Sequence, residues 1–161
     1  MEFLDIEINK KIFIRILAIS IIAIIIFLAL IMSSLLIFKS YKIGPNTIVV
    51  EEEGVINTHI DLLEISGKKI EISGWAYKDD QPIGKVNCNY VLKNKETGKM
   101  YLMRTKMEEN INIQEEDHKL AGLHAQCLTF GIPKGMYDIY VLYQNDGEDI
   151  LAFTLISREI K

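Results

Sequence analysis

The sequence lacks the short motifs that identify most enzyme classes. It contains no G-x-S-x-G nucleophile elbow, no phosphate-binding P-loop, no H-E-x-x-H zinc motif and no S-x-x-K motif with its companions. Each of these motifs holds a nucleophile, a phosphate or a metal in a fixed geometry. Their joint absence does not exclude catalysis, but it favours a protein that is not an enzyme and has no cofactor.

Residue types that bind metals are also scarce, with two cysteines and three histidines among 161 residues. His118, His124 and Cys127 are close in sequence, but no further Cys or His completes a zinc spacing. Residues 108–122 are acidic and long for a loop, yet their carboxylates do not follow the spacing of a known calcium site. We therefore predict no metal site and interpret this segment as a solvated loop.

The two cysteines, Cys88 and Cys127, leave two arrangements open. A disulfide between them would close a loop of about 40 residues and stabilise the fold by roughly 4 kcal/mol, if the domain lies outside the cytoplasm. Two separate buried thiols are the other arrangement, and the sequence favours neither. The immunoglobulin order of Cys, Trp and Cys is not met, because Trp75 precedes both cysteines.

Basic residues are outnumbered by acidic residues after residue 42. From there to the end, thirteen Lys and Arg face nineteen Asp and Glu, a net charge of −6. Such a domain should repel polyanions, which argues against nucleic acid, and against anionic lipid or a phosphate-rich polymer recognised through bulk charge. A small basic pocket within the acidic domain remains compatible with this composition.

Charge is missing altogether from Ile16 to Phe38, a run of twenty-three residues. At 1.5 Å per residue a helix of this length covers roughly 34 Å, enough to cross a hydrocarbon core of about 30 Å. Backbone groups in lipid need internal partners, so the run must be helical despite its many isoleucines. A cleaved signal peptide is the competing interpretation, but its apolar region is usually shorter and ends in a small-x-small site. We therefore predict an uncleaved transmembrane anchor.

Basic residues flank this anchor unequally, with Lys10, Lys11 and Arg15 before it and Lys39 and Lys42 after it. The positive-inside rule then favours a cytoplasmic N-terminus and an extracellular C-terminal domain at the cell membrane. Gly44 and Pro45 prevent the helix from continuing. The predicted organisation is a short cytoplasmic tail at residues 1–11, a transmembrane helix at 12–39, a stalk at 40–46 and an extracytoplasmic domain at 47–161.

The domain after the stalk has the periodicity of strands. Short alternating runs are separated by turn signals about every ten residues, which predicts an all-β fold, an antiparallel β-sandwich of about seven or eight strands. Alternation also predicts the inward side chains. These are Val86, Cys88, Tyr90 and Leu92 in one strand, Ile139, Val141 and Tyr143 in a second, and Leu151, Phe153 and Leu155 in the last.

The strand at residues 69–78 carries the most informative side chains. Strict alternation points Trp75 and Tyr77 outward, where two exposed rings would form a stacking surface for a sugar or a peptide. A bulge at Gly74 would shift the parity and turn Trp75 into the core, and we favour that buried position. Tyr140 is outward by the same alternation. If alternation holds without a bulge, Trp75, Tyr77 and Tyr140 are the aromatic residues that face outward, and they are our candidate binding residues.

Two stretches resemble a known module. They are Ile70-Glu71-Ile72-Ser73-Gly74-Trp75-Ala76, preceded by His59-Ile60-Asp61, and Leu120-Ala121-Gly122-Leu123 with Gly135-Met136-Tyr137-Asp138-Ile139. The pattern resembles a β-sandwich module of Gram-positive cell-envelope and surface-polysaccharide proteins, in which GWA, an AGF-like turn and G-x-Y-x-I follow in this order. Leu123 stands where that pattern favours an aromatic residue. The resemblance implies an extracytoplasmic accessory or binding module and carries over no catalytic residue.

Anchor, sandwich and missing catalytic motifs together favour a non-catalytic binding or scaffolding role at the bacterial cell envelope. The expected partners are the lipid bilayer and a cell-wall glycan or another envelope protein. An alternative is a subunit of a membrane secretion, transport or division complex, whose transmembrane helix pairs with partner helices. A metal-dependent enzyme that uses the acidic segment is the least favoured class.

Overall fold

The structure, a computed structural model, describes residues 2–35, 38–52, 54–79, 81, 86–109, 120–145 and 147–161. The chain divides into two compact units, Met1–Leu35 and Leu36–Lys161. The first is a helix and the second is built from strands.

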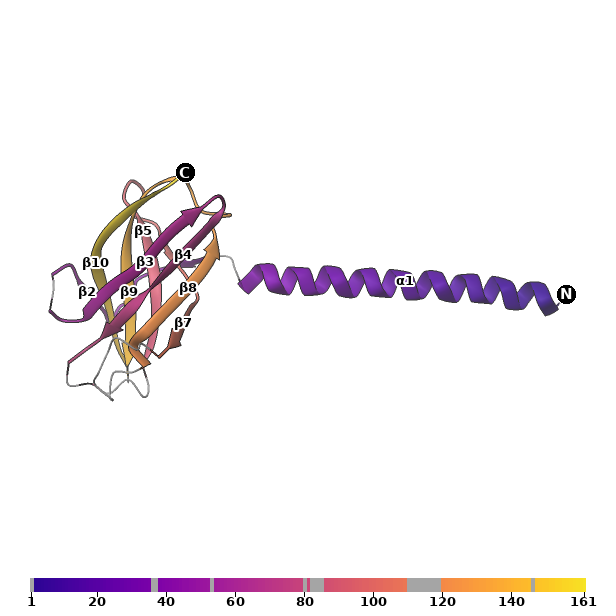
Figure 1. Cartoon of the computed structure of the whole chain (residues 1–161), viewed down its shortest axis with the longest axis horizontal. Helices are drawn as coiled ribbons and strands as arrows, with labels where there is room; N and C mark the ends of the chain where they lie inside the picture. The colour runs from indigo at the N-terminus through magenta and orange to yellow at the C-terminus, as the bar shows by residue number, and fades with distance from the viewer. Residues whose placement is uncertain are drawn as a thin grey trace. The chain divides into compact units, whose positions relative to one another are not determined.

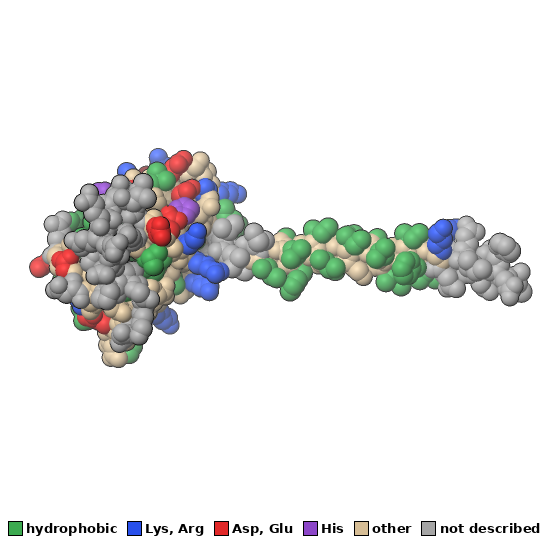
Figure 2. Space-filling model, turned by 60° about the horizontal axis from the view of Figure 1, so that its bottom comes forward, with side chains coloured by type: hydrophobic (Ala, Val, Ile, Leu, Met, Phe, Trp, Pro, Cys, Tyr) green, Lys and Arg blue, Asp and Glu red, His purple; other side chains and the backbone are tan. Residues whose placement is uncertain are grey.

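The helix α1, Glu2–Leu35, contains the 22-residue segment Lys10–Ile31, which is long and apolar enough to cross a membrane. Apolar side chains lie on all sides of this segment rather than along one stripe, and basic side chains lie near its N-terminal end (Figure 2). The hydroxyl of Ser20 donates to the carbonyl oxygen of Ile16 at 3.0 Å, so it has a partner within the helix. The predicted apolar helix is confirmed, but it ends before Lys39, which belongs to a strand.

The described residues after α1 form ten strands in two sheets (Figure 1). They are β1 (Lys39–Tyr41), β2 (Thr47–Val50), β3 (Asn57–Ser66), β4 (Lys69–Tyr77), β5 (Asn87–Asn94), β6 (Met100–Leu102), β7 (Thr105–Glu108), β8 (Gly122–Leu128), β9 (Gly135–Asn145) and β10 (Glu148–Ile160). One sheet has the order β1-β6-β5-β9-β10-β2 and the other β3-β4-β8-β7. All neighbouring pairs are antiparallel except β10 with β2.

The predicted all-β sandwich is therefore confirmed, with ten strands rather than seven or eight. One additional strand is β1, in a segment expected to be a stalk. The other arises because residues 99–107, which look like one strand in sequence, divide into β6 of the larger sheet and β7 of the smaller one. Periodicity alone does not reveal a chain that changes sheets.

The core lies between the sheets. The sets predicted for two strands are buried in it as expected, namely Val86, Cys88, Tyr90 and Leu92 in and beside β5, and Ile139, Val141 and Tyr143 in β9. From the smaller sheet, Ile70 and Ile72 of β4 and Cys127 of β8 join them. Burial of each large apolar side chain stabilises the fold by about 1.5–3 kcal/mol before conformational entropy is subtracted.

The prediction for β10 was wrong. Its inward residues are Ile150 and Ala152, whereas Leu151 and Phe153 belong to a cluster on the outer face of the larger sheet. Leu155 lies in a bulge between Phe153 and Ser157, has a φ of 61° and is 54% exposed. Both faces of β10 are apolar, so alternation could not distinguish them, and the pairing with β9 decides the parity.

The predicted stalk, residues 40–46, also differs. Lys39–Tyr41 pairs with β6, and Phe38 before it is buried in the core. Because β1 and β2 lie at opposite edges of the larger sheet, residues 42–46 must cross that sheet to connect them, and we name them the crossing segment. Gly44 and Pro45 end helical structure as expected, but they do not prevent the following chain from packing on the domain.

The outer face of the larger sheet is covered by its own apolar side chains. It carries a second buried cluster of Val91, Met100, Tyr140, Leu142 and Leu151, against which Tyr41, Leu102 and Phe153 pack. The side chains packed on this cluster thus come from β1, β6 and β10. The smaller sheet has a different outer face, described next.

Candidate functional site

The outer face of the smaller sheet carries exposed aromatic and polar side chains. Along β4 burial alternates without interruption, so Ile72, Gly74 and Ala76 are buried while Trp75 and Tyr77 are half-buried on the outward side. The inward parity favoured for Trp75 was therefore wrong, and strict alternation was right. Trp75 and Tyr77 nevertheless pack partly against the core cluster, so each ring is only partly exposed.

Gly74 does mark a bulge, but the bulge is in the neighbouring strand. The register of β3 against β4 shifts between Ile60 and Leu62, so the extra residue lies in β3 and the parity of β4 is kept. A Cβ atom at Gly74 would lie 2.0 Å from the carbonyl oxygen of His59. Glycine is thus required here because the bulged backbone of β3 approaches it closely.

Three rings stack in a row on this face, and we name His59, Trp75 and Tyr77 the aromatic row. His59 and Trp75 are direct cross-strand partners with ring centroids 5.6 Å apart, and the centroids of Trp75 and Tyr77 are 5.4 Å apart. The interplanar angles of 27° and 26° make both contacts stacked. The sequence did not identify His59 as a site residue, because only the pairing of β3 with β4 brings it to Trp75.

A shallow hollow adjoins the row on the side of β8. The cross-strand partner of Trp75 on β8 is Gly122, which has no side chain to cover the ring. The hollow has a volume of about 160 Å³, and Asp61, Glu108 and Glu109 are among its lining residues. Carboxylates accept hydrogen bonds from hydroxyl groups, so polar groups of a ligand stacked on Trp75 would find acceptors here.

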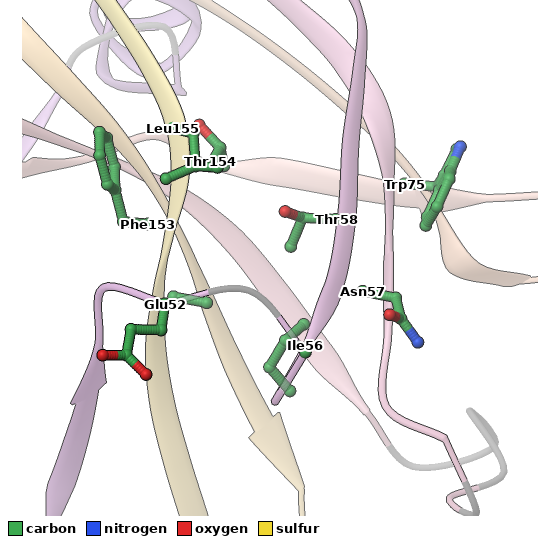
Figure 3. A pocket seen from close by; sticks show the side chains of 10 residues that line it. Glu52, Ile56, Asn57, Thr58, Trp75, Phe153, Thr154 and Leu155 are labelled. Carbon is green, nitrogen blue, oxygen red and sulfur yellow. The ribbon is translucent and has the colours of Figure 1, made fainter.

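A second hollow, of about 270 Å³, lies at the edge of the sandwich between β3 and β10. Figure 3 shows Thr58 facing into it between the two strands, with Phe153 and Leu155 on the β10 side and Trp75 on the far side of β3 from Phe153. Trp75 thus lines this hollow and pairs with Gly122 of the other. Its position between two concave surfaces makes it the centre of the candidate site.

Charged side chains lie next to the aromatic row on the same outer face of the smaller sheet. Glu71 accepts a hydrogen bond from Lys69 at 2.6 Å and lies 3.0 Å from Nε2 of His124. The hydrogen bond from Lys69, and then the one with His124, lowers the pKa of Glu71 below its ordinary value. Glu71 is therefore an ionised and partnered carboxylate, which suits a binding surface better than a proton-transfer site.

Tyr140 does not belong to the site, so this part of the prediction was wrong. It faces outward from the larger sheet as alternation requires, but it is only 2% exposed. Its ring packs 5.1 Å from that of Phe153, and Nζ of Lys93 lies 5.5 Å above it. Burial raises the pKa of its hydroxyl.

Cys88 and Cys127 are free thiols in the structure, in β5 and β8 respectively, and neither is exposed to solvent. Of the two arrangements that the sequence left open, the structure therefore has the separate thiols. Burial raises the pKa of Cys88 to about 12 and that of Cys127 to about 11. Both thiols are protonated at neutral pH and are packing groups rather than nucleophiles.

Within the described residues, no group of three or more His, Cys, Asp or Glu side chains could hold a metal ion. Most of the acidic segment, residues 110–119 with His118, lies outside the described part of the chain. No protein-family model matches the sequence, and neither the curated proteins nor the solved structures include a significant match. The function must therefore be inferred from the residues of this chain.

Proposed function

We propose that this chain is a single-pass membrane protein of the bacterial cell envelope that binds a glycan at the aromatic row without catalysis. The observation that carries the proposal is the stack of His59, Trp75 and Tyr77 on an outward sheet face, beside an uncovered Gly122. The apolar face of a sugar ring stacks on aromatic rings, and its hydroxyls need acceptors such as Asp61 and Glu108 nearby.

The anchor of the proposal is the segment Lys10–Ile31, which has the length and composition of a membrane span. Three basic residues precede the uncharged run Ile16–Phe38 and two follow it, which favours a cytoplasmic N-terminus. This orientation puts the strand domain on the outer side of the membrane, where envelope glycans are found. The domain needs no cofactor for such a role.

Trp75 is the only tryptophan of the chain, so its fluorescence reports directly on the proposed site. We expect soluble cell-wall glycan fragments, added to the detergent-solubilised full-length protein, to shift and quench this emission in a saturable manner. Trp75→Ala and His59→Ala should each lower retention of the protein on immobilised cell-wall glycan by about tenfold. The control Ile48→Ala removes an exposed apolar side chain from β2, away from the site, and should bind normally.

One pair of results would contradict the proposal. If no glycan fragment changes the emission, and Trp75→Ala lowers the melting temperature by several degrees without changing retention, then Trp75 is a packing residue. Replacing residues 16–31 by polyleucine separates the proposal from a role in a membrane complex. A simple anchor tolerates the replacement, whereas a helix that pairs with specific partner helices does not.

A further inference from the structure

The charges of the strand domain gather at one end with a sign opposite to that of the domain as a whole. We name as the basic end the β3–β4 turn, the β5–β6 turn with the adjoining Lys42, the segment between β8 and β9, and residues 158–161. This is the end marked C in Figure 1. Its basic residues, with Lys69 at the start of β4, are Lys42, Lys68, Lys69, Lys95, Lys99, Lys134, Arg158 and Lys161. The acidic residues there are Glu96 and Glu159, together with Glu71 and Asp138 in the adjoining strands.

Hydrogen bonds and strand pairing join these segments into one surface. The amide of Thr129 donates to the carbonyl oxygen of Lys68 at 2.7 Å, and the amide of Lys95 donates to that of Met136 at 2.9 Å. Ile160 pairs with Gly135, which brings the end of β10 beside the start of β9. Lys42 and Lys99 line the same shallow hollow at the edge between β1 and β6.

Most of this charge is not neutralised. Three of the eight basic side chains have a carboxylate within 4 Å, in the pairs Lys69 with Glu71, Lys95 with Asp138 and Lys161 with Glu159. The other five are exposed and make no ion pair within the described part of the chain, namely Lys42, Lys68, Lys99, Lys134 and Arg158. The basic end thus offers free cations to an anionic partner although the domain has an excess of acids.

The segment of the basic end between β8 and β9 also carries an exposed aromatic ring. Phe130 is 68% exposed, more than any other large apolar side chain in the described part of the strand domain. It follows Thr129, whose amide bonds to Lys68, and precedes Lys134 by four residues. A ring on a loop flanked by lysines matches the chemistry of the membrane interface, where the ring enters the headgroup region and the lysines bind the phosphates.

We infer that the basic end docks on the anionic surface of a lipid bilayer, with Phe130 in the interface. A soluble polyanion would use the lysines but would leave the exposed ring of Phe130 without a role. The inference rests on the membrane anchor of the proposed function. β1 begins at Lys39, four residues after the end of α1. A connection this short keeps the strand domain near the membrane in which α1 is anchored, so the domain meets anionic headgroups at a high effective concentration.

Docking in this way would orient the glycan site. Lys69 begins β4 and Trp75 lies six residues further along the same strand, a distance of about 20 Å at 3.3 Å per residue. This exceeds the Debye length of about 8 Å at physiological ionic strength, so carboxylates beside Trp75, such as Glu108, are largely screened from the basic end. The aromatic row would be held away from the lipid and toward the glycan.

The test uses the full-length protein, carrying Trp75→Phe and Phe130→Trp so that its only tryptophan reports on the tip of the basic end. It is incorporated into nanodiscs of phosphatidylcholine alone or with phosphatidylglycerol, in versions with and without brominated acyl chains. We expect a blue-shifted emission and strong quenching by brominated lipid in the anionic discs, and weak quenching in the neutral discs. Raising the salt concentration should weaken the quenching in the anionic discs.

Two double variants of equal charge change complete the design. Lys99→Glu with Lys134→Glu should reduce the ratio of docked to undocked protein by at least about thirtyfold, because two attractive charges are lost and two repulsive ones are added. Arg104→Glu with Lys106→Glu alters exposed residues at and next to β7, outside the basic end, and should leave docking unchanged. Equal quenching in neutral and anionic discs, or an equal loss in both variants, would overturn the inference.

Failure of the docking is distinguishable from failure of the proposed function. A protein that does not co-elute with the discs lacks the anchor, which overturns both proposals. If the Trp75→Phe, Phe130→Trp protein co-elutes with the discs but shows no lipid-dependent quenching, while the protein that retains Trp75 binds glycan, docking alone is overturned.

Discussion

The outer faces of the two sheets are built from similar residues but differ in what covers them. Each carries aromatic side chains that alternation points outward, Tyr140 on the larger sheet and Trp75 and Tyr77 on the smaller one. Tyr140 is 2% exposed and packs within an apolar cluster, whereas Trp75 and Tyr77 are half-buried and stack with His59. Facing outward from a sheet is therefore not the same as being accessible to a ligand.

Side chains that pack on the larger sheet account for the difference. Tyr41, Leu102 and Phe153 cover the cluster on its outer face that contains Tyr140. On the smaller sheet, β3 and β4 are joined by a tight turn through Gly67, and Gly122 leaves the region beside Trp75 bare. One face became a second core and the other remained a surface.

The sharpest test of this comparison replaces tyrosine by alanine on both faces. Tyr140→Ala should lower the free energy of unfolding by about 3–5 kcal/mol, because it leaves a cavity beneath Phe153 and Lys93. Tyr77→Ala should cost less, about 1 kcal/mol, because its ring is only partly buried. Denaturant unfolding of the detergent-solubilised protein, followed by circular dichroism, measures both. Equal losses would show that the two faces are equally covered.

A second test removes the glycine that accommodates the bulge. Gly74→Ala places a Cβ atom against the carbonyl oxygen of His59 and should cost about 1–3 kcal/mol of stability. It should also separate β3 from β4 locally and change the emission of Trp75, because the stack with His59 depends on that pairing. The neighbouring change Ser73→Ala, on the outward side of β4, should stay within about 0.5 kcal/mol of the wild type. A fully stable Gly74→Ala protein would contradict the bulge.

The smallest expected effect concerns an ion pair at the end of the sandwich opposite to the basic end. Lys78, just after β4, donates to both carboxylate oxygens of Glu148 in β10, at 3.1 and 2.9 Å, and so connects the two sheets. The hydrogen bond from Lys78 lowers the pKa of Glu148 below 4.5. Its stabilisation is therefore present above pH 4.5 and is lost as the pH falls through the lowered value.

Glu148→Gln should accordingly reduce stability at neutral pH by less than about 1 kcal/mol, since both partners are partly exposed. The difference from the wild type should vanish in acid, where Glu148 itself is protonated. Melting temperatures between pH 3 and pH 7 measure the effect, with the exposed Glu64→Gln as control. A difference that grows on acidification would have the wrong sign for this ion pair.

Several features followed from the sequence because they depend on local pattern. A long uncharged run can only be an apolar helix in lipid, and the described helix α1 includes Lys10–Ile31. The inward sides of β5 and β9 were predicted correctly because Asn87, Asn89 and Asp138 mark the opposite side as polar. Trp75 and Tyr77 were outward for the same reason, with Glu71 and Ser73 beside them in β4.

Other features depend on which strands become neighbours, and local pattern does not contain that information. Both faces of β10 are apolar, and only its pairing with β9 decides which face is buried between the sheets; Tyr41 and Phe153, distant in sequence, cover Tyr140. Contacts between distant segments likewise bring His59 to Trp75 and gather lysines at the basic end. The sequence by itself determined the apolar helix and most of the strands, through the periods of helix and strand. The tertiary structure decided which face is open and where charge gathers, because both result from contacts between segments far apart in the chain.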